Sequence, residues 1–456
     1  MNRVASRSTI ALILAVILLA GMCLFVVEYL LNAGQWAMFQ GNPHVYTGVN
    51  IGCGIITDRS GEILLNATDE RTYAADAAVR KSTIHWLGDR YGYISAPAVA
   101  QYASNMAGYD LLNGLYGYSG IGGSAELTIC AGLQKAALEA MGKKKGTLAV
   151  YNYKTGEILC AVSTPNYDPD NVPDIDENEE KFEGIYVNRF TQTTYVPGSV
   201  FKLVTAAAAL DTLDNALEIE FSCDGSYEMS GGKVKCTGEH GRIGLKKALQ
   251  KSCNCYFAQL TEVLGADTLQ KYVKQYKITE PVSFDGITTA RGSFSVEDAS
   301  AQQIAWAGIG QYLDTVNPCR YMTFMGVIAG GGEAAEPYIV RSAGSGIFGG
   351  YKASKTSTGS LMDRDTAEAL GALMRSNVEN QYGDDNFPGL TVCAKSGTAE
   401  VGGDRKPNAT FAGFCADEEY PLAFIVVVED AGSGAKTCVP IISQVLAAYK
   451  EMMDSE

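Results

Sequence analysis

The sequence has few histidines, few prolines and no excess of positive charge. Only 13 prolines stand beside 50 glycines and 25 tyrosines in 456 residues, which is not the composition of a disordered or collagen-like chain. The net charge of −15 argues against a nucleic-acid partner, because phosphates would be repelled. The three histidines, His44, His85 and His240, lie far in sequence from the best nucleophile candidate below, which weakens a Ser-His-Asp interpretation.

The twelve cysteines include no Cys-x-x-Cys pair. Such pairs are typical of structural zinc sites, so we predict no metal site and no cofactor. Most of the cysteines are expected to be small buried apolar residues. Cys223 and Cys236 bracket a Gly-containing segment and are the best disulfide candidates. His240, four residues after Cys236, is interpreted as a surface or loop histidine.

One long hydrophobic run stands near the N-terminus. Residues 10–27 are uncharged and apolar, and the run continues through Glu28 to Leu31. This length is sufficient to span a bilayer, and no clear signal-peptidase site follows it. Arg3 and Arg7 precede the run, so the short N-terminal side is expected in the cytoplasm. The sequence therefore predicts a single-pass protein of the cell membrane with its remaining residues outside.

The rest of the chain divides into two expected domains. Short strands and a helix are expected before the charged segment Lys143-Lys144-Lys145-Gly146, which is typical of the end of a helix. A hairpin around residues 153–156, a helical middle, three strands between residues 390 and 429 and a closing helix follow. This order predicts an α+β fold, an antiparallel sheet with helices packed on it. We divide the chain into residues 1–33 (cytoplasmic stub and membrane anchor), 34–145 (N-terminal domain) and 146–456 (functional domain).

Ser199 and Lys202 form the first motif with chemical meaning. They open an apolar helix after Pro197-Gly198, and residues three apart share a helix face. A neighbouring lysine with a lowered pKa can activate a serine hydroxyl as a nucleophile. Ser230 and Ser433 are also followed by a lysine at the third position, but both lie in Gly-rich stretches unsuited to a rigid helix.

Two further motifs follow in order. Ser252-Cys253-Asn254 is the only Ser-x-Asn in the chain, and it combines a hydroxyl that can relay a proton with an amide that can hold a lysine and a carbonyl. Lys395-Ser396-Gly397-Thr398 lies on an expected strand, where Gly397 allows close backbone approach and the polar residues suit a carboxylate. Ser-x-x-Lys, Ser-x-Asn and Lys-Ser-Gly in this order match the motif set of β-lactamases and penicillin-binding proteins.

Other segments carry a closer resemblance. They are residues 58–61, 127–134, 155–159, 163–169, 195–202 and 395–400. With these segments the chain resembles the class B penicillin-binding proteins, monofunctional transpeptidases of elongation (cell shape), cell division and spore formation. Cys130 stands where Asp is usual in that family, and Ser396 replaces the commoner Thr.

The resemblance implies a serine β-lactamase-like transpeptidase domain behind a non-catalytic pedestal. It also implies that Ser199 is the acylated nucleophile, Lys202 its base, Ser252 the proton relay and Asn254 the residue that orients Lys202 and the acyl donor. Lys395 and Thr398 would bind the terminal carboxylate of the substrate, supported by Ser396 and Gly397. The backbone N–H groups of Ser199 and Thr398 would form the oxyanion hole.

The expected reaction is D,D-transpeptidation of peptidoglycan stem peptides through a Ser199 acyl-enzyme, with release of the terminal D-Ala. By the same resemblance, β-lactams would trap Ser199, and a membrane glycosyltransferase is the expected partner. The motifs leave alternatives open. A D,D-carboxypeptidase or a β-lactamase would use the same acyl-enzyme, and a non-catalytic scaffold of a cell-wall complex would keep the fold without acylation.

Overall fold

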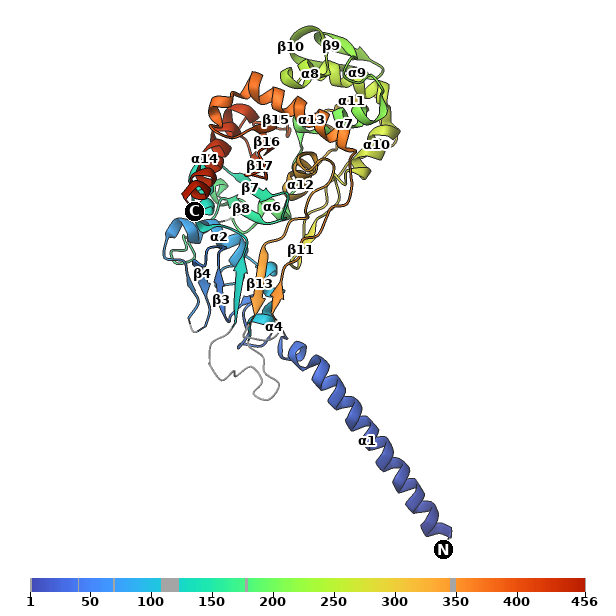
Figure 1. Ribbon diagram of the computed structural model, residues 1–456, viewed down its shortest axis with the longest axis vertical. Coiled ribbons are helices and arrows are strands. Elements are labelled where there is room, and N and C mark those ends of the chain that lie inside the picture. Colours follow the sequence, from blue (N-terminus) through green and yellow to red (C-terminus); the bar gives the residue numbers. More distant parts are fainter. Residues whose placement is uncertain are drawn as a thin grey trace.

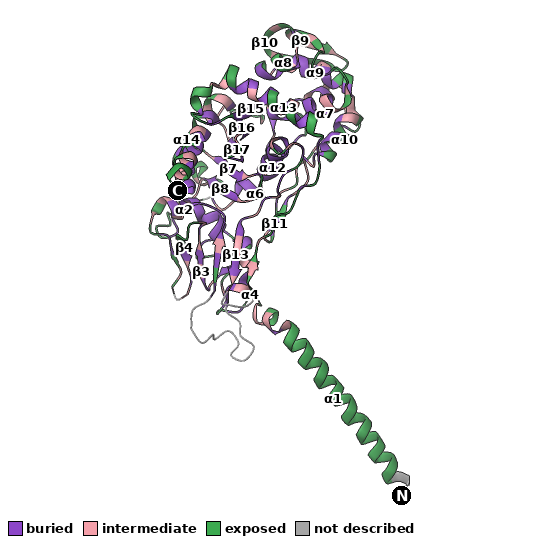
Figure 2. Cartoon of the chain, viewed as in Figure 1, coloured by how far each residue is buried: buried purple, intermediate pink, exposed green. Residues whose placement is uncertain are grey.

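The N-terminal helix stands apart from the rest of the molecule. The computed structural model describes residues 2–39, 41–68, 70–107, 123–176, 179–344 and 350–455. Helix α1 (Asn2–Ala37) projects away from the folded body and is exposed along nearly all its length (Figures 1 and 2). It is long and apolar enough to cross a membrane. It thus agrees with the span expected from the hydrophobic run.

A six-stranded sheet forms the body next to α1. Its order is β14-β13-β6-β3-β4-β5. The strands are β3 (Ile55–Thr57), β4 (Ile63–Asn66), β5 (Thr72–Tyr73), β6 (Ser124–Leu127), β13 (Val340–Gly344) and β14 (Tyr351–Lys352). A two-stranded pair, β1 (Tyr46–Thr47) with β2 (Asn50–Ile51), precedes it. Strands β13 and β14 come from the second half of the chain, so both expected domains contribute to this sheet.

The second sheet has five antiparallel strands in the order β15-β16-β17-β7-β8. They are β7 (Gly146–Asn152), β8 (Ile158–Thr164), β15 (Val392–Ala399), β16 (Asn408–Cys415) and β17 (Leu422–Val428). Nearly every residue of these strands is buried, because helices cover both faces. Strand β15, which carries the Lys-Ser-Gly motif, lies at one edge.

The two faces of this sheet belong to two different apolar cores. On one face, Leu148 and Val426 pack with helices α5 (Ala131–Met141) and α14 (Gly434–Ser455). On the other, Ala149 and Ile425 join a core that includes α12 (Pro318–Ala329) and α13 (Arg364–Asn377). Helices α2 (Ala77–Leu87) and α6 (Arg189–Gln192) contact β8. The alternation of side chains along each strand produces this two-sided burial.

A mainly helical part lies at the end of the molecule farthest from α1 (Figure 1). Its elements are the 3₁₀-helix η2 (Gly198–Phe201), α7 (Lys202–Thr212), β9 (Glu220–Met229), β10 (Gly232–Gly244), α8 (Leu245–Lys251), α9 (Asn254–Leu264), α10 (Ala266–Gln275) and α11 (Ala301–Ala307). The shorter elements elsewhere are η1 (Glu180–Phe182), β11 (Ser283–Phe284), β12 (Ile287–Thr288), the π-helix η3 (Val378–Tyr382) and η4 (Asp384–Asn386). Strands β9 and β10 pair as a separate two-stranded hairpin.

The sequence pattern predicts helices over residues 96–115 and 244–264, and both predictions are wrong. The expected helix over residues 244–264 is broken into α8 and α9, because Ser252 adopts a left-handed conformation (φ 51°). The expected helix over residues 96–115 is reduced to α3 (Pro97–Ala100) and α4 (Ala103–Met106), and residues 108–115 lie outside the described part. Between α3 and α4, Tyr102 stacks on Tyr351 and donates to Asp285, contacts that outweigh helix propensity.

Candidate active site

Ser199 and Lys202 stand where a 3₁₀ turn becomes a buried helix. Gly198 has φ 57°, a conformation that favours glycine, and directs the chain into η2. Lys202 begins α7, whose residues from Lys202 to Ala209 are all buried. The lysine cannot reach bulk water, so its ammonium group must be satisfied by protein oxygens. Ser199, by contrast, is half-buried.

The break between α8 and α9 presents the Ser-x-Asn motif. The left-handed Ser252 ends α8, and Cys253 is the extended N-cap residue of α9, which begins at Asn254. A continuous helix would point residues 252 and 254 in different directions. The break instead turns both polar side chains toward Lys202, as the contacts below show. The backbone strain at Ser252 therefore serves the geometry of the site.

Lys202 joins the first two motifs. Its Nζ lies 3.0 Å from Oγ of Ser199, 3.1 Å from Oγ of Ser252 and 2.7 Å from Oδ1 of Asn254. It also lies 2.7 Å from the backbone oxygen of Ser252. An ammonium group has three hydrogens for these four oxygens, whereas a neutral amine has a lone pair for a hydroxyl proton. Burial lowers the pKa of Lys202 from 10.5 to about 7.

Lys395 brings the third motif to the same serine. Its Nζ lies 3.2 Å from Oγ of Ser252 and 2.7 Å from the backbone oxygen of Ser396. Lys395 is fully buried, and burial followed by the charge of Lys202 holds the pKa of Lys395 well below its usual range. Ser252 Oγ is thus shared by two buried lysines, which is a suitable place for a proton relay.

The remaining residues of β15 line its exposed edge. Ser396 is half-buried and Thr398 is exposed, while Gly397 is buried between them. Oγ of Ser396 lies 2.9 Å from the hydroxyl of Tyr382, which also accepts the Ser396 N–H at 2.9 Å. Oγ1 of Thr398 accepts the backbone N–H of Gly434 at 3.2 Å. Two residues outside the motifs therefore hold this edge in place.

Glycines allow η2 to lie directly against β15. A Cβ at Gly198 would stand 2.7 Å from the backbone oxygen of Thr398, and one at Gly397 would stand 2.8 Å from the backbone oxygen of Pro197. These separations are shorter than real Cβ contacts. The prediction that Gly397 makes room for a second backbone agrees with this geometry, and the second backbone is the one that carries Ser199.

The structure thus gathers residues from all three predicted motifs. Ser199, Lys202, Ser252, Asn254 and Lys395 form one connected set of polar contacts. The three motifs do not include Tyr382, at the end of the π-helix η3, or Asn377, whose Nδ2 donates to the backbone oxygen of Ala394 at 3.1 Å. Neither stands in a recognisable pattern, so the sequence offered no signal for them.

The cysteine predictions need correction. The expected Cys223–Cys236 disulfide is wrong, because both residues are free thiols. Nδ1 of His240 lies 3.4 Å from Sγ of Cys223 and 3.6 Å from Sγ of Cys236. His240 is therefore not a plain surface residue, and these groups with Cys253 could hold a metal ion. The lack of Cys-x-x-Cys pairs says little about metal binding by this group, because its thiols come from three different elements: β9, β10 and the start of α9.

Comparison with known proteins places the chain in a family. Residues 146–447 match the family model described as the penicillin binding protein transpeptidase domain. The chain belongs to the penicillin-binding protein transpeptidase family. The match covers the five-stranded sheet and all three motifs, and the resemblance to class B penicillin-binding proteins is confirmed. The predicted α+β transpeptidase fold is confirmed as well.

Several relatives of this penicillin-binding protein are informative. The peptidoglycan D,D-transpeptidase PbpA of Mycobacterium tuberculosis is 28% identical, over 72% of each chain. Stage V sporulation protein D of Bacillus subtilis is 28% identical over 68% of this chain and 49% of its own. Among solved structures, the penicillin G acyl-enzyme complex of M. tuberculosis penicillin-binding protein A has a TM-score of 0.75 and 25% identity. That alignment covers 88% of this chain and 99% of the other.

Proposed function

We propose that this penicillin-binding protein is a peptidoglycan D,D-transpeptidase that works through an acyl-enzyme on Ser199. The observation that carries the proposal is the position of Lys202 Nζ, within hydrogen-bond distance of Ser199 Oγ, Ser252 Oγ and Asn254 Oδ1. The names of the relatives support the reaction, and the acyl-enzyme complexes among the similar structures support the intermediate.

Acylation begins with Lys202 in its neutral form. Its amine takes the proton of Ser199 Oγ, and that oxygen attacks the carbonyl carbon of the penultimate D-Ala. The resulting oxyanion is held by the backbone N–H groups of Ser199 and Thr398, which the close approach of η2 to β15 brings to the same region. Donors aimed at developing negative charge can contribute about 3–4 kcal/mol to the transition state.

Collapse of this intermediate breaks the bond to the terminal D-Ala. The departing nitrogen needs a proton, which Ser252 Oγ delivers while it receives the proton held by Lys202. In the second half-reaction an amine of a neighbouring stem attacks the ester. Its proton passes back through Ser252 and Lys202 to Ser199 Oγ, so the enzyme returns to its starting state. Asn254 keeps Lys202 in place throughout.

The acyl donor is held by its terminal carboxylate. Lys395 and the hydroxyl of Thr398 bind that group, and Ser396 and Gly397 shape the strand edge beside it. In the free enzyme the two buried lysines share Ser252, and the charge of Lys202 lowers the pKa of Lys395. An arriving carboxylate favours the charged form of Lys395, so substrate binding and the protonation of this lysine are coupled.

We further propose that α1 anchors the protein in the cytoplasmic membrane with the N-terminus inside. Arg3 and Arg7 at the start of α1 support this orientation. The catalytic part then lies outside, where peptidoglycan is cross-linked. A membrane glycosyltransferase is the proposed partner, since it would supply the glycan strands. Residues 34–145 form most of the pedestal between the membrane and the catalytic part.

The test uses full-length protein in detergent and a synthetic stem peptide ending in D-Ala-D-Ala, with and without an amine acceptor. Mass spectrometry follows D-Ala release and the peptide product. We expect the cross-linked product with acceptor, and its loss in Lys202→Ala. A hydrolysed product alone, unaffected by acceptor, would identify a carboxypeptidase. If folded protein releases no D-Ala, with or without acceptor, the result would favour a non-catalytic scaffold.

A further inference from the structure

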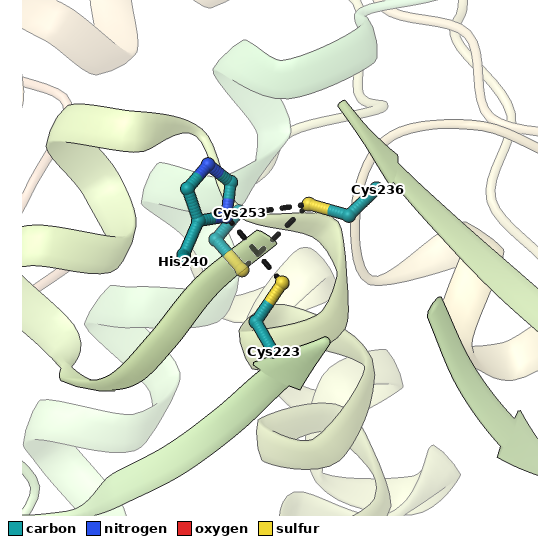
Figure 3. Close-up of side chains that lie close together, drawn as sticks. All are labelled: Cys223, Cys236, His240 and Cys253. Atoms are coloured by element: carbon teal, nitrogen blue, oxygen red, sulfur yellow. Dashed lines mark hydrogen bonds between the residues drawn. The ribbon is translucent and has the colours of Figure 1, made fainter. Parts of the chain in front are cut away.

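Four side chains outside the catalytic set converge behind the Ser-x-Asn motif. Cys223 comes from β9, Cys236 and His240 from β10, and Cys253 from the N-cap of α9. Their ligand atoms all lie within 4.8 Å of one another. Figure 3 shows the three sulfur atoms and the imidazole turned toward a common centre. Cys223 and Cys253 are fully buried, and Cys236 and His240 are half-buried.

Three of the six separations between these atoms match a tetrahedral site, and the others lie within 4.8 Å. Zinc bonds of about 2.3 Å to sulfur and about 2.0 Å to nitrogen give tetrahedral edges of about 3.8 Å between sulfurs and about 3.5 Å between sulfur and nitrogen. The sulfurs of Cys236 and Cys253 are 3.8 Å apart. Nδ1 of His240 lies 3.4 Å and 3.6 Å from the sulfurs of Cys223 and Cys236.

The local backbone is arranged around these ligand atoms. Residues four apart in a regular strand lie on the same face but about 13 Å apart. The β9–β10 register shifts between Lys235 and Glu239 and again between Glu239 and Gly241, and the strand bends there, where Cys236 and His240 come together. At the start of α9, the N–H of Asn254 donates to Sγ of Cys236 (3.3 Å) and the N–H of Tyr256 to Sγ of Cys253 (3.4 Å). Such donors, at the positive end of a helix, stabilise thiolate sulfur.

The hairpin packs on α9, where Phe221 meets the ring of Tyr256, but its own fully buried face is small. In β9, where every residue is described, Cys223 alone is fully buried, and β10 buries only Val234 and Ile243. A two-stranded hairpin with so small an apolar face is marginally stable in water. A metal ion that links β9, β10 and α9 would stabilise the folded hairpin and its packing on α9.

We propose that Cys223, Cys236, His240 and Cys253 bind a structural zinc ion that holds the Ser-x-Asn motif in its catalytic position. Three thiolates and one neutral imidazole fill all four positions of a tetrahedral ion, so the site is closed and has no position for substrate. Binding releases three thiol protons, and the ion with its ligands carries a net charge of −1. Softer sulfur ligands in this geometry favour zinc over magnesium or calcium.

The connection to the active site is short. Cys253 stands between Ser252 and Asn254, and the amide of Asn254 donates to the backbone oxygen of Lys235, next to Cys236, at 3.0 Å. That bond directs Oδ1 of Asn254 toward Lys202. Zinc would thus fix the positions of Ser252 and Asn254, whose side chains both contact the base Lys202. The metal site stands on its own geometry, whereas its effect on acylation rests on the proposed function.

The first experiment measures metal without using activity. Full-length protein without a histidine tag is purified in detergent, with reductant and without chelator, and its zinc is counted by plasma mass spectrometry. We expect about one zinc per chain, lost in Cys236→Ser and in His240→Ala. The control is Cys160→Ser, which alters a fully buried thiol in β8, outside the cluster. Folded native protein without zinc, a Cys236–Cys253 disulfide in its place, or zinc retained by both variants would overturn the site.

Cobalt replacement covers the case in which the variants fail to fold. Native protein stripped of zinc and loaded with Co²⁺ should show the sulfur-to-cobalt charge-transfer and intense visible bands of a tetrahedral thiolate site, and weak octahedral bands would overturn it. Benzylpenicillin acylation of Ser199 should slow about tenfold on zinc removal and recover when Zn²⁺ returns. Equal acylation rates with and without zinc would overturn the positioning role while the zinc count still stands.

Discussion

Lys202 and Lys395 are fully buried and share the hydroxyl of Ser252. Burial lowers the pKa of Lys202 to about 7, and negative charge on the sulfurs of Cys236, Cys253 and Cys255 acts in the opposite direction. Because Lys202 acts as a base only when neutral, acylation at saturating drug should rise with pH up to about 7 and level off above it. Below pH 7 the neutral fraction falls about tenfold per pH unit.

The measurement is the rate constant for acylation by benzylpenicillin between pH 5.5 and 9, with circular dichroism at each pH as the folding control. Equal rates at pH 6 and pH 8, or an inflection near pH 10, would contradict a buried lysine base. The variant Lys202→Arg should be inactive throughout the range, because a guanidinium stays charged.

Tyr382 is a positioning residue for the β15 edge. Its hydroxyl meets both the N–H and the Oγ of Ser396. Tyr382→Phe removes these bonds and keeps the ring against Phe411, so we expect about 1 kcal/mol less stability and a KM for the stem peptide raised about fivefold. The kcat should change less than twofold. Steady-state kinetics test this split, and an unchanged KM would contradict the positioning role.

At this scale the sequence predicted which motif side chains lie together better than it predicted the residues that hold them in place. The order of the three motifs identified residues that meet in space, from Ser199 to Lys395. It did not identify Tyr382 or Asn377, because each acts through hydrogen bonds to β15, 14 and 17 residues further along the chain, and leaves no local pattern. It also led us to expect no metal site from the cysteine spacing, although the side chains that we propose as ligands, on β9, β10 and α9, need only meet after folding.

Among the elements, η2 and β15 are in contact through glycine. Gly397→Ala places a Cβ 2.8 Å from the oxygen of Pro197, so η2 must move away from the strand. Displacing a nucleophile by about 1 Å can cost about a hundredfold in rate, and we expect that loss in acylation. The measurement is the second-order rate of labelled-penicillin binding, with Tm as the check on folding.

Gly371→Ala is the matched control. A Cβ there would meet only the Phe414 ring at 3.5 Å, an ordinary contact in the middle of α13. Its acylation rate should equal that of the native protein, with a slightly higher Tm, because alanine favours the helix. If Gly397→Ala acylated as fast as this control, the close approach of η2 to β15 would have no functional role.

Strongly patterned elements were predictable from sequence, and interrupted ones were not. The hairpin β7–β8, the strands β15, β16 and β17, and the helices α13 and α14 have continuous apolar patterns that local physics determines. No glycine or proline marks the break between α8 and α9 at Ser252, so tertiary contacts rather than local sequence determine it. The membership of β13 in the sheet near α1 depends on pairing with β6, more than two hundred residues earlier.

At the scale of the whole molecule, the two expected domains exchange elements across residue 146. Strand β6 pairs with β13, and α5 buries Leu133 and Met141 against the sheet and α14. Full burial of one such side chain contributes about 1.5–3 kcal/mol. A fragment of residues 146–456 should therefore lose several kcal/mol of stability and acylate poorly.

The matched fragment of residues 124–456 retains both β6 and α5. It should unfold at a higher temperature than the shorter fragment and resist protease longer. Thermal melts and limited proteolysis compare the two directly. Equal melting temperatures would show that the catalytic part is independent of these elements, and the boundary at residue 146 would then also be a folding boundary.

The central claim is that Ser199 is the residue that becomes acylated. Full-length protein in detergent is incubated with benzylpenicillin, and intact mass and peptide mapping locate the adduct. We predict one added drug molecule on Ser199, absent in Ser199→Ala and unchanged in Ser230→Ala and Ser433→Ala, which share the Ser-x-x-Lys spacing. A folded protein that gains no drug mass, or gains it on another residue, would contradict the account.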